Sequence, residues 1–140
     1  MIEKIKESFP LIGRVLIGGM FLVAGIQKVT GFDAMVGFAA SVGMPAPTAA
    51  IILAAIIEIG AGAAVILGWR IREAALALAV FTVVATAYFH MNLADQMQTI
   101  LFTKNLAILG GLLYVAAFGA GRFAVACCEN CANCEHCRKA

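Results

Sequence analysis

Long apolar stretches, nearly free of polar residues, alternate with short polar segments along this chain. Four of them match the roughly 17–25 apolar residues that a helix needs to cross a bilayer core. They cover about 11–28, 48–69, 74–91 and 100–120. Their apolar residues are continuous and not alternating, which excludes barrel strands, and a soluble bundle would need polar helix faces that these stretches lack. Because backbone groups in hydrocarbon must be satisfied within the segment, the pattern predicts an all-α integral membrane protein with four transmembrane helices in a bundle.

The composition narrows the class of protein further. Apolar residues make up 63% of the 140 residues and charged residues 13%, against about 45–50% and about 25% in soluble domains. The net charge of +2 is too small and too scattered for a nucleic-acid-binding surface. We therefore expect the lipid bilayer, and no nucleic acid, as the main partner.

Positive charges predict how the chain is oriented in the membrane. Seven lysines and arginines fall on the side that holds both termini and the loop between the second and third spans, and only two fall on the other side. Because cytoplasmic segments are enriched in these residues, both termini are expected to be cytoplasmic. The prediction is a cytoplasmic N-terminus over 1–10, a membrane domain over 11–122 and a cysteine-rich cytoplasmic tail over 123–140. The loop 29–47 would then lie outside, with a short interfacial helix over 33–41.

Ionisable residues occur inside the spans, where each costs at least about 2.5–3.5 kcal/mol and often serves a function. In the first span, Arg14, Gly18, Phe21, Gly25 and Lys28 share one helix face. The two glycines on that face would let a neighbouring helix approach closely, and small-residue seams of this kind also permit a homodimer. Arg14 and Lys28 are candidate ligand-binding residues, or they extend to the headgroups on either side.

Glu58 stands about 10 residues into the second span, which is about 15 Å from the predicted outer surface. The glutamate side chain is too short to reach the surface from that depth. Its carboxyl group must therefore be neutral, paired or next to water. Glu58 is a candidate proton carrier, and the alternative is a protonated side chain hydrogen-bonded to another helix. Pairing with Lys28 is left open, because the helix rise places the two residues about 10 Å apart in depth.

The third and fourth spans add polar residues near the outer surface. Thr82, Thr86 and His90 form a stripe at four-residue steps, and Lys104 and Asn105 open the fourth span. His90 is a candidate proton carrier or an interfacial residue, and Lys104 and Asn105 are candidate ligand-binding residues. We expect Lys28, Glu58, His90, Lys104 and Asn105 to converge in the outer half of the bundle. Such a pocket would suit an anion or a quinone headgroup, or it would move protons.

All five cysteines lie in the last 14 residues. Cys128, Cys131, Cys134 and Cys137 form a C-x2-C-x2-C-x2-C run that is a candidate ligand set for zinc, copper(I) or an iron–sulfur cluster. The regular spacing differs from the two-knuckle zinc pattern and lacks the ferredoxin ending. Redox-active thiols and a tail without a specific ligand are the other interpretations.

The ordered set of these residues resembles the DoxX family of small four-helix membrane proteins. The resemblance covers roughly residues 9–122, and it rests on three groups of positions: Arg14, Gly18, Phe21, Gly25 and Lys28; Gly31, Phe32, Gly43, Pro45 and Pro47; and Glu58, Gly68, Arg72, His90, Lys104, Asn105, Gly110 and Gly111. It implies a four-helix membrane bundle, with a bacterial-type plasma (inner) membrane as the expected location. Some relatives are membrane subunits that pass electrons from thiosulfate to a quinone, and others are linked to thiol homeostasis. The cysteine tail departs from this family pattern.

Three functional hypotheses follow. The first is a redox-linked membrane subunit that acts with a quinone and with thiosulfate or thiols, and that receives electrons through a soluble or membrane partner. The second is a transporter of a small molecule or a soft metal. The third is a non-catalytic scaffold that holds a soluble redox partner at the membrane.

Overall fold

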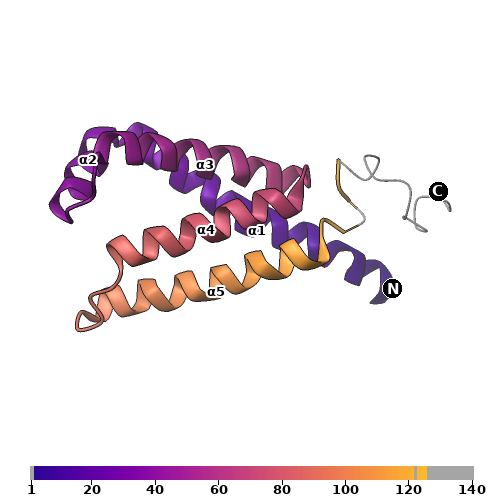
Figure 1. Cartoon of the computed structure of the whole chain (residues 1–140). Coiled ribbons are helices and arrows are strands. Elements are labelled where there is room, and N and C mark those ends of the chain that lie inside the picture. The colour runs from indigo at the N-terminus through magenta and orange to yellow at the C-terminus, as the bar shows by residue number, and fades with distance from the viewer. Residues whose placement is uncertain (1, 122, 126–140) are drawn as a thin grey trace.

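The computed structural model describes residues 2–121 and 123–125, with side chains from Ser8 onward, and every regular element in them is a helix. The helices are α1 (Ile2–Thr30), α2 (Phe32–Ser41), α3 (Pro47–Leu67), α4 (Ile71–Phe89) and α5 (Gln96–Phe118) (Figure 1). Four of them, α1 from Ser8 onward, α3, α4 and α5, are long and apolar enough to cross a membrane. The predicted fold class is therefore confirmed, and α2 is the short helix expected over 33–41.

The helix ends differ from the predicted span ends because hydropathy locates apolar segments and not helical hydrogen bonding. The first helix begins at Ile2, well before the predicted 11. The last begins at Gln96 and not at about 100, because Asp95 caps it: the Asp95 carboxylate accepts a hydrogen bond from the backbone N–H of Met97 at 2.9 Å. Helix α3 ends at Gly68, whose φ of 74° allows Trp69 to donate back to the carbonyl of Ala64.

The four long helices pack in a fixed order. Helix α1 lies along α3, α3 packs against α4, and α4 packs against α5. Helices α1 and α5 meet over a short stretch, where a Cβ at Gly111 would lie 3.1 Å from Cδ1 of Ile17. We call the end of the bundle that holds α2 and the α4–α5 loop the α2 end, and the opposite end the terminal end (Figure 1). The predicted orientation would place the α2 end outside and the terminal end in the cytoplasm.

Glycines set the close packing of α1 on α3. A Cβ at Gly18 would lie 2.6 Å from the carbonyl oxygen of Gly62, and a Cβ at Gly25 would lie 2.6 Å from Cγ1 of Ile59 and 3.1 Å from Cβ of Glu58. Real Cβ atoms essentially never approach other atoms this closely, so the two backbones are in contact because side chains are missing. The small-residue face predicted for the first span is thus confirmed as the α1–α3 interface.

The most deeply buried apolar side chains lie close to this crossing. Val65, Leu78 and Leu112 are fully buried, and Phe21 packs with them. Toward the α2 end the burial of α4 falls, since its last buried residue is Thr82, and Leu112 is the one residue of α5 that is buried. A groove therefore lies between α4 and α5 in the half near the α2 end.

Candidate functional site

A buried ion pair joins α1 to α3. The ammonium nitrogen of Lys28 lies 2.9 Å from Oε1 and 2.8 Å from Oε2 of Glu58. The Glu58 side chain is 4% exposed and the Lys28 side chain 20% exposed. The Glu58 carboxylate is thus enclosed, and the Lys28 side chain is the member of the pair that reaches the molecular surface.

The two side chains meet because each points along its helix toward the other. A helical side chain is tilted toward the N-terminus of its helix. Helix α1 runs toward the α2 end and α3 runs away from it, so the Lys28 side chain points back to the level of Gly25, and the Glu58 side chain points toward the α2 end. Gly25 packs on Glu58 and stands three residues from Lys28, so the remaining rise is only about 4.5 Å. The structure therefore resolves the question of pairing that the sequence left open.

The pair has no net charge when lysine is protonated and glutamate ionised. This arrangement lowers the cost of placing either charge in a bilayer, since each alone would lack a counterion. It also holds one exchangeable proton between two groups at membrane depth. The arrangement can therefore hold a proton between two groups of opposite charge.

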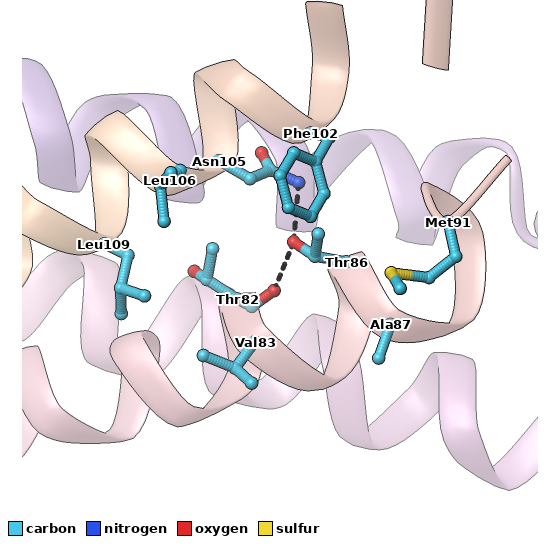
Figure 2. Close-up of a pocket in the computed structure, with 9 residues that line it drawn as sticks. All are labelled: Thr82, Val83, Thr86, Ala87, Met91, Phe102, Asn105, Leu106 and Leu109. Atoms are coloured by element: carbon cyan, nitrogen blue, oxygen red, sulfur yellow. Dashed lines mark hydrogen bonds between the residues drawn. The ribbon is translucent and has the colours of Figure 1, made fainter. Parts of the chain in front are cut away.

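A groove opens between α4 and α5 toward the α2 end. Its volume is about 230 Å³ and its walls are almost entirely apolar, with Leu109 at one end and Met91 at the other (Figure 2). Three polar side chains line it, those of Thr82, Thr86 and Asn105. The sequence showed the threonine stripe and Asn105 separately, but the groove itself was missed because it exists only where the two helices pack.

Hydrogen bonds fix the orientation of the Asn105 amide. Thr86 donates its hydroxyl hydrogen to the carbonyl of Thr82 at 2.6 Å, so its oxygen accepts, at 3.0 Å, from Nδ2 of Asn105 (Figure 2). Thr82 in turn donates to the carbonyl of Leu78 at 2.7 Å. Within the described part of the chain, the second N–H of Asn105 and its Oδ1 have no partner. The amide is therefore held by one bond and keeps one donor and one acceptor for another molecule.

The remaining predicted residues near the α2 end lie apart from these groups. Nδ1 of His90 lies 2.7 Å from Oε1 of Gln98, a contact across the α4–α5 loop that the sequence gave no reason to expect. Lys104 is exposed and makes no hydrogen bond or ion pair with any described residue. The expected convergence is thus divided among three places: the Lys28–Glu58 pair, the groove with Asn105, and the His90–Gln98 contact. Among the described residues, no hydrogen bond or ion pair connects one place to another.

The ion pair and Asn105 nevertheless stand at the same depth. Gly18 and Gly111 both lie at the level where α1 crosses α3 and touches α5. Gly25, which packs on Glu58, is seven residues from Gly18, and Asn105 is six residues from Gly111. At about 1.5 Å per residue, both sites lie about 9–11 Å from the crossing, toward the α2 end.

Arg14 lies at the terminal end and is buried, with 1% of its surface exposed. Nη2 donates to the carbonyl of Phe123, and the guanidinium occupies the place that a Cβ at Gly68 would take. Val125 donates to the carbonyl of Leu67 at 3.0 Å, so the segment 123–125 covers the C-terminal end of α3. The side chain is thus enclosed between Gly68 and this segment. It lies where a cation offsets the partial negative charge of a helix C-terminus, and Nε and Nη1 have no hydrogen-bond partner among the described residues.

Arg14→Met is expected to release the segment 123–125, because a hydrogen bond to a charged group contributes about 1.5–3 kcal/mol. Hydrogen exchange at the Val125 amide should become about tenfold faster or more. The control is Arg72→Met, an exposed arginine at the same end. Equal exchange in the two variants would show that Arg14 does not hold the segment.

The candidate metal ligands Cys128, Cys131, Cys134 and Cys137 lie outside the described residues. Among the described residues, no group of three or more histidine, cysteine, aspartate or glutamate side chains is placed to hold a metal ion. The metal site stays a prediction.

Four membrane-spanning helices with a buried ion pair and a lipid-facing groove define a multi-pass helical membrane protein. The chain belongs to the DoxX family, whose model matches residues 9–91. The matched region takes in Arg14, Lys28, Glu58 and His90, and it ends before Lys104 and Asn105.

A curated relative supports this assignment. Over 73 residues the chain is 37% identical to the inner membrane protein YqjF of Escherichia coli strain K12. The overlap covers 52% of this chain and 56% of the relative, so the chain spans about half the length of the curated relative that it matches. No solved structure matches the chain.

Proposed function

We propose that this protein is a redox-linked subunit of the inner (plasma) membrane that acts with a quinone, with thiosulfate or a small thiol as the electron source. The observation that carries the proposal is the Lys28–Glu58 ion pair, whose carboxylate is enclosed between α1 and α3. Membership of a family of small membrane proteins and the similarity to an inner membrane protein support the location. We take both termini as cytoplasmic, as the distribution of lysine and arginine predicts.

Reduction of a quinone to a quinol consumes two electrons and two protons. Two thiols that join in a disulfide release two electrons and two protons, so the exchange balances. Two thiosulfate ions that join in tetrathionate release two electrons, and the two protons then come from the protein or from water. A proton held between Lys28 and Glu58 would provide one of the two, and the second proton, with the one that recharges the pair, would come from water.

The test compares removal of the pair with removal of a surface pair. The double variant Lys28→Met/Glu58→Leu replaces the ions with apolar groups of similar size, so it should stay folded. Its quinone reduction by thiosulfate or a small thiol, in membranes that overproduce the protein, is expected to fall about 100-fold or more, the range of lost proton transfer. The assay follows quinone absorbance against empty-vector membranes.

The matched control is Arg70→Gln/Glu73→Gln, which removes the exposed pair at 3.5 Å. It should keep full activity. Activity that survives loss of the buried pair would refute the proposal. Activity lost only in the surface variant would instead support a scaffold that holds a soluble partner on its cytoplasmic surface.

A further inference from the structure

We infer that the Lys28–Glu58 pair exchanges its proton with one compartment only, the one that the α2 end faces, and that Lys28 carries the exchange. The inference deepens the proposed function, on which the use of that proton rests, whereas one-sided exchange itself requires no substrate. The orientation expected from the lysines and arginines makes this compartment the outside of the cell.

The two members of the pair differ in their access to the surroundings. Lys28 lies in the last turn of α1, close to the end of the helix at Thr30, and its side chain is 20% exposed. The Glu58 side chain is only 4% exposed, and a Cβ at Gly25 would lie 3.1 Å from its Cβ, so α1 covers it. The Lys28 ammonium lies within 2.9 Å of both carboxylate oxygens. A proton that enters from the α2 end therefore reaches Lys28 first.

Contact between the backbones of α1 and α3 closes their interface on the terminal side of the pair. A Cβ at Gly18 would lie 2.6 Å from the carbonyl oxygen of Gly62 and 2.7 Å from Cγ1 of Ile66. A Cβ at Gly62 would in turn lie 3.2 Å from the backbone nitrogen of Leu22. An atom 2.7 Å from an aliphatic carbon is inside its contact distance, so the sphere of about 1.4 Å radius that a water needs is not free at this point.

The side chains packed on the same side offer water no hydrogen-bond partners. Phe21, Val65, Leu78 and Leu112, one from each spanning helix, belong to a buried cluster whose described members are all apolar. A buried water makes about three hydrogen bonds to polar groups, and this cluster provides no polar side chain for them. Arg14, the nearest ionisable residue before Lys28 on α1, lies 14 residues away, about 21 Å along the helix. The described side chains therefore provide no route for a proton from the terminal end.

The other ionisable side chains near the α2 end do not contact the pair. Helix α3 has none besides Glu58, and Arg72 and Glu73 of α4 are exposed at the terminal end. Among the described residues, no hydrogen bond or ion pair joins Lys28 or Glu58 to the ionisable groups at the α2 end. These groups are Asp33 on α2, Tyr88 and His90 at the end of α4, Asp95 before α5, and Lys104 on α5.

The exchange balances in protons and charge. When Lys28 gives up its proton, a neutral amine remains beside the ionised Glu58, and the pair carries one negative charge. A hydronium ion at the α2 end then protonates the amine and leaves as water, which restores the pair. The proton that the pair supplies in each turnover is thereby replaced from that compartment.

The test measures the protonation of Glu58 from each side in the unmodified protein. Right-side-out and inside-out membrane vesicles that contain the full chain are treated with dicyclohexylcarbodiimide, which modifies protonated carboxyl groups in apolar surroundings. The external pH is changed while the interior stays buffered, and modified Glu58 is quantified by peptide mass spectrometry. A rise of one pH unit on the side of the α2 end is expected to lower the labelling rate by up to about tenfold, because the protonated fraction follows that pH. The same rise on the other side should leave the rate unchanged.

The controls fix the orientation and the response. The exposed Ser41→Cys, labelled with a membrane-impermeant maleimide, identifies the compartment that the α2 end faces. Glu73, exposed at the terminal end and labelled with a water-soluble carbodiimide, should follow only the pH on its own side. Lys28→Met should abolish the response of Glu58, whereas Lys104→Met, which removes an exposed lysine at the same end, should leave it intact. Glu58 labelling that follows the pH of the terminal side, of both sides or of neither overturns the inference.

This inference and the proposed function fail separately, because the labelling needs no quinone, thiosulfate or thiol. One-sided labelling of Glu58, together with quinone turnover that ignores the pair, would keep the exchange and refute the proposed function. Turnover that depends on the pair, with labelling that follows the terminal side, would keep the function and refute the exchange at the α2 end.

Discussion

Glu58→Leu alone is expected to destabilise the folded protein by about 3–5 kcal/mol, because it leaves the Lys28 ammonium without its counterion. Lys28→Met alone should cost a similar amount, since it leaves a carboxylate that is only 4% exposed. The measurement is the free energy of unfolding in detergent or nanodiscs. Neither effect depends on what the protein binds, so this prediction tests the geometry and not the proposed function.

The double variant Lys28→Met/Glu58→Leu provides the control for these single changes. Apolar residues of similar volume often replace a buried ion pair at no net cost, so the double variant should recover most of the stability lost in each single variant. The interaction energy from this double-mutant cycle is then large. Losses that simply add, with no recovery, would show that the two side chains are not paired.

Gly18→Ala is the second change with a large expected effect, about 1–3 kcal/mol of lost stability. The added Cβ would lie 2.6 Å from the carbonyl oxygen of Gly62. That neighbour is backbone, so it cannot rotate away as a side chain could, and α1 and α3 must separate. Separation would also move Lys28 relative to Glu58, so the unfolding midpoint and quinone turnover should fall together.

The adjacent glycine provides the control. A Cβ at Gly19 would meet nothing within 4 Å, and alanine favours a helix over glycine by about 1 kcal/mol. Gly19→Ala should therefore leave stability unchanged or raise it slightly. Equal losses in the two alanine variants would contradict the contact between α1 and α3 as the cause, because only the Cβ at Gly18 would meet another helix.

The sequence by itself determined the class of protein and the faces of its helices. Continuous apolar stretches leave only helices as membrane-spanning elements, because backbone groups in hydrocarbon must bond within their own segment. The three- and four-residue spacing of Gly18, Phe21, Gly25 and Lys28 indicated which face of α1 meets its neighbour. Local rules were enough for these conclusions, since helix periodicity and hydropathy do not depend on the partner helix.

Only the tertiary structure decided which polar groups meet. The membrane depths predicted from helix rise left the pairing of Lys28 with Glu58 open. The antiparallel packing of α1 and α3 resolved it by directing the two side chains toward each other. The same packing placed Asn105 against Thr86 and left Lys104 exposed. It also buried Arg14 under residues more than a hundred positions away. Such contacts depend on the order and spacing of whole helices in the bundle, and no local pattern in the sequence encodes that order.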